Sequence, residues 1–446
     1  MTKILVLGAG KSATDLIEYL LVRSEKYNWK ITVGDYNEAL AAQKVGNHPN
    51  GKAVLFDVHD AAMRSKMVSE ADLVASVLPA KFHYLVAEDC LKHGKHIVTP
   101  SYVSDKEKQL DEAFRKADLL FMGEIGLDPG IDHMSIMKML ADIKAKGGTV
   151  TSVKSFTGAL IAPESLGENP WKYKFTWAPM NVILAGQGTA QYLYEGKPKY
   201  VPYSRLFSTT SQYDFEDLGT FEGYPNRNSI VYKDKYNIPK VPNLLRGTLR
   251  YGGYVQAWDA LVQLGLTRND IRLAHSNQLT YADLVTAFLP ANAKGANLQQ
   301  RLADFLGLSE ENATVQKIAW TGLLSDASIP LANATPAEIL AELLERKWVL
   351  GKQDKDLIVM VHLMDYVVNG EKHRLASRLV IKGKDADHTA IAKTVGVPMA
   401  IMVKLLATGK INLTGVHIPL EPQVYLPILE ELEEFGIVFQ ESESKV

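Results

Sequence analysis

Residues 4–13 read Ile-Leu-Val-Leu-Gly-Ala-Gly-Lys-Ser-Ala, an apolar run that passes directly into the pattern G-x-G-x-x-A. The following residues repeat at the spacing of one apolar helix face: Ala13, Leu16, Ile17, Leu20 and Leu21. This order of strand, glycine-rich turn and amphipathic helix predicts a βαβ unit that binds a dinucleotide.

Each small residue of the pattern has a physical role in such a site. Gly8 allows the tight turn, Gly10 lets the backbone approach the pyrophosphate, and Ala13 lets helix and strand pack closely. The start of the helix offers unpaired N–H groups and a partial positive charge to the phosphates. We therefore assign Gly8, Gly10, Lys11, Ser12 and Ala13 to the cofactor site.

Further cofactor contacts are expected beyond the carboxyl ends of the later strands, where parallel sheets bind their ligands. Asp35 follows the second apolar run, and a carboxylate there accepts hydrogen bonds from ribose hydroxyls and repels a 2′-phosphate. No Arg or Lys occurs in residues 35–38 to bind that phosphate, so the sequence favours NAD over NADP. The other candidates at strand ends are Asp57, Val58, Leu78, Pro79 and Thr99.

The first 126 residues alternate between short apolar runs and helical stretches. The runs are residues 4–7, 31–33, 54–56, 73–78, 97–98 and 119–122. They predict six strands of a doubly wound (Rossmann) parallel sheet, so the fold class is α/β. From residue 150 the pattern becomes strand-like and interrupted by prolines. Asn369-Gly370, between two apolar stretches, predicts a β-hairpin and hence an antiparallel sheet.

These patterns divide the chain into three parts. We expect an NAD-binding domain over residues 1–126 and an α+β substrate-binding and dimerisation domain over residues 127–385. A C-terminal helical segment, residues 386–446, is expected to pack back on the first domain.

The composition is that of a soluble globular protein, with 46% hydrophobic and 22% charged residues in 446. A formal net charge of −2 predicts no basic surface for nucleic acid or an anionic membrane. No uninterrupted apolar run reaches the roughly eighteen residues of a membrane span. The one cysteine, Cys90, excludes an internal disulfide and a multi-cysteine zinc site. We expect a cytoplasmic protein without a metal.

A series of motifs follows along the chain: VTPSYVS (98–104), EIGLDPGIDH (124–133), APES (162–165), YKFTW (173–177), YPNRNS (224–229) and RGTLRY (246–251). In this order they resemble the saccharopine dehydrogenase family, L-glutamate-forming type, over essentially the whole chain. The resemblance implies reversible oxidation of a C–N bond. Hydride passes from the lysine ε-carbon of saccharopine to the nicotinamide, and water splits the resulting imine into glutamate and α-aminoadipate semialdehyde. It also implies a homodimer.

The resemblance implies a set of substrate-binding residues. Saccharopine carries three carboxylates, which planar guanidinium groups bind well. Arg227 and Arg250 match the arginines that relatives use for this purpose, and Thr248 and Leu249 adjoin Arg250. Thr157 stands where relatives carry a cysteine, so a thiol has no role at this position and only a polar contact remains.

The resemblance further implies a reacting centre where cofactor and substrate meet. Ser101, Tyr102 and Asp128 belong to it, and Tyr102 and Asp128 are the acid–base candidates. Asp128 would lie at the domain junction and receive the substrate ammonium, or it would cap the helix that begins after Pro129. Leu127 and Trp177 are assigned to the cofactor, although Trp177 would equally well simply pack.

Other titratable residues are interpreted structurally. His133 is expected to be a packed or capping group, and Cys90 a small core residue. His83, His93 and His96 lack metal-ligand spacing. Two alternatives to the saccharopine reaction stay open: a related amine dehydrogenase acting on carboxynorspermidine or on lysine at its ε-amine, and a non-catalytic NAD-binding protein.

Overall fold

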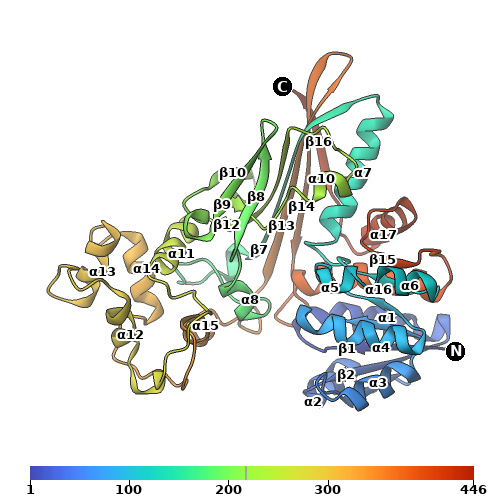
Figure 1. Ribbon diagram of the computed structural model, residues 1–446, viewed down its shortest axis with the longest axis horizontal. Helices are drawn as coiled ribbons and strands as arrows, with labels where there is room; N and C mark the ends of the chain where they lie inside the picture. The colour runs from blue at the N-terminus through green and yellow to red at the C-terminus, as the bar shows by residue number, and fades with distance from the viewer. Residues whose placement is uncertain (216–217) are drawn as a thin grey trace. The chain divides into compact units, whose positions relative to one another are not determined.

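The computed structural model describes residues 1–215 and 218–446 (Figure 1). It divides into two compact units by its internal contacts. Unit 1 comprises Met1–Val150 and Tyr366–Val446, and unit 2 comprises Thr151–Asp365. This division falls elsewhere than the predicted boundaries after residues 126 and 385, because residues 127–150 and 366–385 also belong to unit 1.

Unit 1 is built around a seven-stranded sheet with the order β15-β6-β5-β4-β1-β2-β3. Its strands are β1 (Thr2–Leu7), β2 (Trp29–Asp35), β3 (Gly51–Leu55), β4 (Leu73–Ser76), β5 (His96–Val98), β6 (Leu120–Met122) and β15 (Gly415–His417). All of its strand pairs are parallel. The predicted doubly wound sheet and its six strands are confirmed. The seventh strand, β15, comes from the C-terminal part of the chain and was not predicted.

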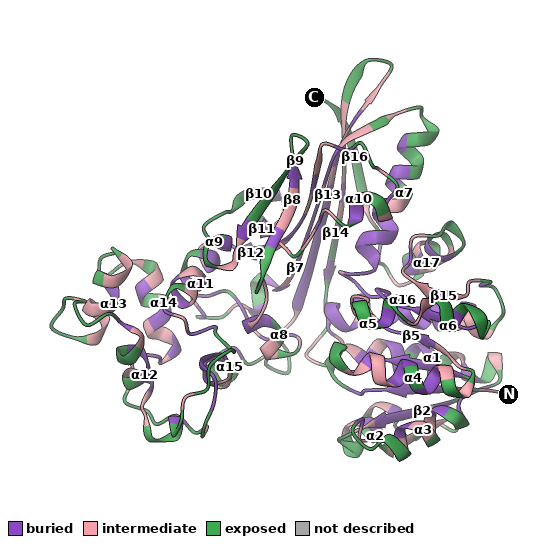
Figure 2. Ribbon diagram, in the orientation of Figure 1, coloured by how far each residue is buried: buried purple, intermediate pink, exposed green. Residues whose placement is uncertain are grey.

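Helices lie on both faces of this sheet, and their buried faces are purple in Figure 2. The helices of unit 1 are α1 (Thr14–Tyr27), α2 (Glu38–Val45), α3 (Ala61–Glu70), α4 (His83–His93), α5 (Asp105–Lys108), α6 (Asp111–Lys116), α7 (Ile131–Ala145), α16 (Ala390–Ala407) and α17 (Pro422–Glu434). Of these, α7 lies away from the seven-stranded sheet and packs against α17. The predicted apolar face of α1 is buried.

Helix α16 packs closely against α1. A Cβ at Gly396 would lie 2.7 Å from the backbone nitrogen of Leu16, so the close approach requires glycine. Among the described residues, α16 is the one helix long and apolar enough to cross a membrane, with a mean hydropathy of 1.6. Because 72% of it is buried within the protein, packing in the core accounts for this hydropathy.

Unit 2 contains strands in the order β10-β11-β12-β7-β13, with β8 beside β12 and β9 beside β8. They are β7 (Thr149–Ile161), β8 (Thr189–Tyr194), β9 (Lys197–Pro202), β10 (Ser211–Phe215), β11 (Gly219–Pro225), β12 (Asn243–Tyr251) and β13 (Asp356–Val368). Strands β12 and β7 are parallel, so this sheet is mixed rather than purely antiparallel. Its helices are α8 (Pro179–Ile183), α9 (Tyr203–Leu206), α10 (Tyr232–Lys235), α11 (Tyr254–Gln263), α12 (Tyr281–Phe288), α13 (Leu298–Leu306), α14 (Ala313–Thr321) and α15 (Pro336–Lys347).

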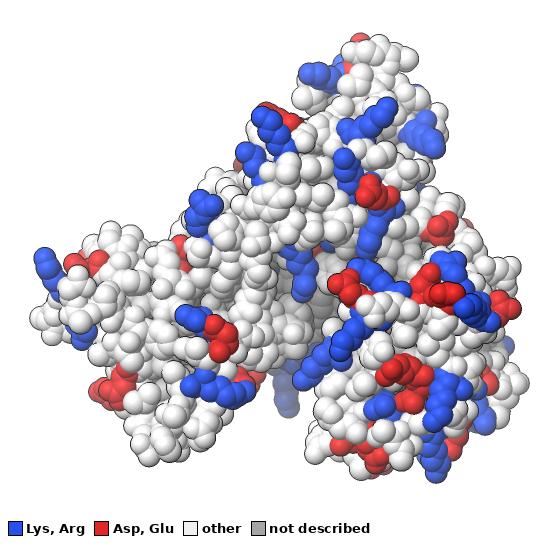
Figure 3. All heavy atoms as spheres, in the orientation of Figure 1, with Lys and Arg blue, Asp and Glu red and all other residues white. Residues whose placement is uncertain are grey.

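Asn369 and Gly370 connect β13 to β14 (Glu371–Lys382), as the sequence predicted. Both residues have positive φ, 51° and 81°, which is the geometry of a tight hairpin turn. In unit 1, β14 pairs antiparallel with β16 (Gln440–Lys445). On the face drawn in Figure 3, acidic and basic side chains are interspersed and form no extended basic patch.

Candidate active site

The glycine-rich turn after β1 has the geometry of a phosphate-binding loop. Gly8 has φ of 101°, and a Cβ there would lie 3.1 Å from the carbonyl oxygen of Val77. A Cβ at Gly10 would meet nothing within 4 Å, so open space lies above this part of the turn. Lys11, Ser12 and the buried Ala13 form a short 3-10 helix that leads into α1. The turn therefore fits the pyrophosphate of a dinucleotide.

Asp35, at the end of β2, holds this turn through its carboxylate. Its Oδ2 accepts a hydrogen bond of 2.6 Å from the N–H of Ala9, and its Oδ1 accepts one of 2.8 Å from the N–H of Asn37. Both oxygens are thus engaged by the backbone of the protein. This carboxylate therefore organises the turn, and each oxygen can still accept a second hydrogen bond.

The predicted cofactor residues that follow β3 and β4 differ in burial and in hydrogen bonding. Asp57 follows β3 and accepts a hydrogen bond of 2.9 Å from the N–H of His59. Val58 is buried, and its carbonyl accepts a hydrogen bond from Arg64. Leu78 is half-buried and Pro79 is exposed, and both follow β4 after Val77.

His83, at the start of α4, bonds to hydroxyl groups at the ends of β4 and β5. Its Nδ1 lies 3.0 Å from Ser76 Oγ, and its Nε2 lies 2.8 Å from Thr99 Oγ1 and 2.9 Å from Ser101 Oγ. Burial lowers the pKa of His83 to about 4, so the imidazole is neutral at neutral pH. Sequence reasoning missed this role, because His83 was considered only as a metal ligand. Among the described residues no group of three His, Cys, Asp or Glu could hold a metal.

The two predicted acid–base residues are in contact. The phenol of Tyr102 donates a hydrogen bond of 2.9 Å to Oδ1 of Asp128, and both side chains are half-buried. Asp128 is not the N-cap residue of α7. The N-cap of that helix is Gly130, whose N–H donates instead to Oδ1 of Asp132 over 2.7 Å. Leu127, the preceding residue, is buried.

In unit 2, the predicted substrate residue Arg250 is a buried cation on β12. Its guanidinium carbon lies 5.3 Å from the ring centre of Tyr173 and 5.5 Å from that of Tyr254. Its Nη1 donates to the carbonyl of Leu249, and its buried Nε has no hydrogen-bond partner. Among the described residues, no carboxylate lies within ion-pair distance of Arg250.

The carboxylate opposite Arg250 on the neighbouring strand, that of Glu222, is bonded to backbone N–H groups. Glu222 of β11 pairs with Arg250 in the register. Its two oxygens accept hydrogen bonds from the N–H groups of Gly253 and Val255, at 2.9 and 3.1 Å. Glu222 thus stabilises the start of α11 and leaves the guanidinium without a counter-ion.

The other substrate candidates in unit 2 are distributed along β12. Arg227 lies in the loop after β11, with φ of 51°. This loop contacts β12 at Arg246, because the N–H of Asn226 donates a hydrogen bond of 2.9 Å to the carbonyl of Arg246. Four residues of strand, roughly 13 Å, therefore separate this point from Arg250.

Several polar atoms near Arg250 are buried without a partner. Thr248 pairs in register with Thr157, whose Oγ1 is one of these atoms. Others are the phenol oxygen of Tyr173 and the indole nitrogen of Trp177. Such atoms cost free energy unless a ligand or water satisfies them, so Thr157 and Tyr173 are candidate polar contacts for a ligand that binds Arg250.

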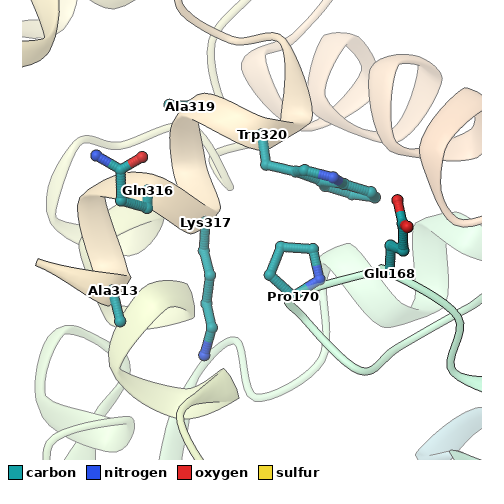
Figure 4. A pocket seen from close by; sticks show the side chains of 7 residues that line it. All are labelled: Glu168, Pro170, Ala313, Gln316, Lys317, Ala319 and Trp320. Carbon is teal, nitrogen blue, oxygen red and sulfur yellow. The ribbon is translucent and has the colours of Figure 1, made fainter. Parts of the chain in front are cut away.

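A pocket of about 550 Å³ lies elsewhere in unit 2, beside α14 (Figure 4). Its lining residues are Glu168, Pro170, Ala313, Gln316, Lys317, Ala319 and Trp320. None of the predicted site residues lines it. The ammonium of Lys317, one of its lining groups, is bonded to the carbonyl of Gly253.

The family assignment rests on two matches. The family described as Saccharopine dehydrogenase NADP binding domain matches residues 4–122. The one described as Saccharopine dehydrogenase C-terminal domain matches residues 126–437. The chain belongs to the saccharopine dehydrogenase family.

Relatives within this family agree over the full length of the chain. The saccharopine dehydrogenase [NADP(+), L-glutamate-forming] of Schizosaccharomyces pombe is 32% identical, covering 99% of both chains. The mitochondrial alpha-aminoadipic semialdehyde synthase of Mus musculus is 35% identical over 98% of this chain, which spans 47% of that protein. The structure of apo saccharopine dehydrogenase (L-Glu forming) from Saccharomyces cerevisiae matches with a TM-score of 0.88 and 30% identity, covering both chains fully.

The prediction of NAD as cofactor is wrong by these comparisons. The fungal saccharopine dehydrogenases are named for NADP(+), and the matching N-terminal family is described as NADP binding. The physical reason lies in Asp35, which the prediction treated as a ribose ligand. Its oxygens accept hydrogen bonds from Ala9 and Asn37, so an acidic residue at this position does not by itself select the cofactor.

Proposed function

We propose that this protein is an NADP-dependent oxidoreductase that interconverts saccharopine with L-glutamate and α-aminoadipate semialdehyde. The names of its relatives and the dinucleotide-binding turn support this reaction. The observation that carries the substrate assignment is the buried guanidinium of Arg250, which lacks a carboxylate partner among the described residues.

An unpaired buried charge destabilises a protein by several kcal/mol, so Arg250 requires a functional explanation. A substrate carboxylate would supply the missing counter-ion. Burial raises the pKa of both Tyr173 and Tyr254, so these neighbours stay neutral phenols at neutral pH. A phenol can then donate a hydrogen bond to the same carboxylate, which adds to the charge pairing.

The turn at Gly8 and Gly10 would hold the pyrophosphate of NADP, whose nicotinamide supplies the hydride acceptor when bound. Tyr102 and Asp128 would handle the proton of the substrate amine. Because each carboxylate oxygen can accept more than one hydrogen bond, Asp128 can accept the bond from Tyr102 and another from a substrate ammonium. The ammonium would transfer its proton to Asp128, whose carboxylate becomes a neutral carboxyl group, and the Tyr102 phenol, bonded to Oδ1, would keep that group oriented toward the amine.

The test is a spectrophotometric assay of purified protein with NADP and each of three amines: saccharopine, carboxynorspermidine and lysine. We expect NADPH formation with saccharopine and a kcat/KM for the other two amines lower by at least about 10²-fold, since neither presents three carboxylates. Preferential turnover of either other amine would contradict the substrate assignment. Tight NADP binding without turnover of any of them would contradict an enzymatic role.

A further inference from the structure

We propose that Glu124 and His133 are positioning residues, which hold the segment of Tyr102 and the turn of Asp128 in the geometry that the reaction needs. Both residues lie in unit 1. This role deepens the proposed function, and its catalytic consequence rests on that function. Sequence reasoning predicted His133 only as a packed or capping group and assigned no role to Glu124.

Glu124 binds the residues on both sides of Tyr102. Its N–H donates a hydrogen bond of 3.0 Å to the carbonyl of Ser101, and its Oε1 accepts one of 3.3 Å from the N–H of Val103. One residue therefore fixes the backbone before and after the Tyr102 side chain. Glu124 has φ of 55°, a conformation that costs a non-glycine residue about 1–3 kcal/mol. The hydrogen bonds to Ser101 and Val103 offset the cost of this backbone conformation of Glu124.

His133 holds the carboxylate of Glu124 in place. Its Nε2 lies 2.9 Å from Glu124 Oε2, and the two side chains are 0% and 2% exposed. Its Nδ1 lies 3.5 Å from Oδ2 of Asp132, whose other oxygen accepts the N–H of Gly130. Gly130 closes the turn that carries Asp128. The network of Glu124, His133 and Asp132 thus connects both ends of the Tyr102–Asp128 hydrogen bond.

The chemistry of this network favours positioning over simple packing. Well-packed apolar residues usually stabilise a core as well as a buried pair of ionisable groups does. A buried pair gives in addition a directional contact that fixes its partners. Because a displacement of about 1 Å at a reacting centre can lower a rate about 10²-fold, such fixation matters most beside acid–base groups.

The first experiment compares Glu124→Gln with Glu431→Gln. Glu431 is a largely buried carboxylate of the same unit that accepts a hydrogen bond from the phenol of Tyr19 and pairs with Lys404, so its variant also weakens buried carboxylate contacts, far from Tyr102 in the sequence. We expect Glu124→Gln to lower kcat for saccharopine about 10- to 100-fold with KM changed less than about threefold. Glu431→Gln should stay within about twofold of wild type in kcat.

A second measurement separates positioning from general loss of structure. If Glu124 acts through Tyr102, then Glu124→Gln should lower kcat little further in a Tyr102→Phe background. Multiplying effects of the two substitutions would overturn the proposal. So would equal kcat values for Glu124→Gln and Glu431→Gln.

Amide hydrogen exchange tests the geometry without reference to activity. We expect faster exchange at residues 101–104 in Glu124→Gln than in Glu431→Gln or wild type, because the neutral amide is a weaker acceptor for the N–H of Val103 than the carboxylate. Unchanged exchange would overturn the proposal. If the wild-type protein does not turn over saccharopine, the proposed function fails, and the exchange measurement still decides whether Glu124 holds this segment.

Discussion

Tyr102 and Asp128 lie 26 positions apart in the chain, and the phenol of the first donates a 2.9 Å hydrogen bond to the carboxylate of the second. The topology explains their meeting. Tyr102 follows β5 and Asp128 follows β6, and these strands are parallel neighbours whose carboxyl ends lie at the same edge of the sheet. The fold thereby brings the proposed acid–base pair to the edge where parallel sheets bind their ligands.

Removing the Tyr102 hydroxyl tests this pair. We expect Tyr102→Phe to lower kcat with saccharopine about 10²-fold, the lower end of what a positioned acid–base group contributes. The matched control is Tyr19→Phe, which removes another tyrosine–carboxylate hydrogen bond of unit 1. Steady-state kinetics of both variants decide the question, and an unchanged kcat in Tyr102→Phe would exclude the phenol from the chemistry.

Replacing Arg250 should affect stability and substrate affinity in opposite directions. Arg250→Met removes an unpaired buried charge, so we expect the free energy of unfolding to rise by about 1–4 kcal/mol. At the same time KM for saccharopine should rise by about two orders of magnitude, because the carboxylate loses its counter-ion.

Thermal unfolding and initial rates of the same preparation measure both effects. Lys174→Met is the comparison for stability, since Lys174 is paired with Asp354 at 2.7 Å and its loss leaves that carboxylate unpaired. This variant should be destabilised. A lower Tm together with an unchanged KM in Arg250→Met would show that Arg250 is structural.

The two glycines of the first turn should respond differently to alanine. A Cβ at Gly10 meets no protein atom within 4 Å, so Gly10→Ala should leave Tm nearly unchanged and weaken NADP binding about tenfold or more. Gly8→Ala should lower stability by more than about 1 kcal/mol, because φ is 101° there. Thermal unfolding and fluorescence titration with NADP measure the contrast. Equal NADP affinity in Gly10→Ala and wild type would place the pyrophosphate elsewhere.

His83 predicts a pH dependence of stability. Burial lowers its pKa from 6.5 to about 4, so the unfolded chain binds a proton between these pH values and the folded protein does not. Stability contributed by the neutral imidazole is complete above pH 6.5 and is lost as the pH falls to about 4. The loss amounts to about 3 kcal/mol.

The variant His83→Gln lacks this titration. As the pH is lowered from neutral to the pKa of His83 in the folded protein, the wild type should therefore lose unfolding free energy relative to the variant. Denaturant unfolding at a series of pH values measures it. Parallel curves for the two proteins would contradict a buried neutral His83.

The strands of unit 1 could be predicted because parallel strands covered on both faces read as continuous apolar runs, as residues 4–7 and 73–78 do. Strand β15 could not, since Gly415-Val416-His417 has no apolar run and owes its pairing to β6. The pairing of Tyr102 with Asp128 was within reach, because both follow strands of one sheet.

The parts of the site that escaped prediction are buried polar contacts. Glu124 resembles an ordinary surface carboxylate in the sequence, and only the folded structure shows that it is buried against His133. Asp35 was misinterpreted for a related reason. The backbone N–H groups that occupy its carboxylate come from Ala9 and Asn37, and such contacts leave no signal in the identity of any residue.

The position of the hydride tests the central claim most directly. Saccharopine deuterated at the lysine ε-carbon should, with this protein and NADP, yield deuterated NADPH together with an equal amount of glutamate. Mass spectrometry of the products measures both. Unlabelled NADPH with release of lysine would show oxidation on the other side of the secondary amine, and it would contradict the reaction that we propose.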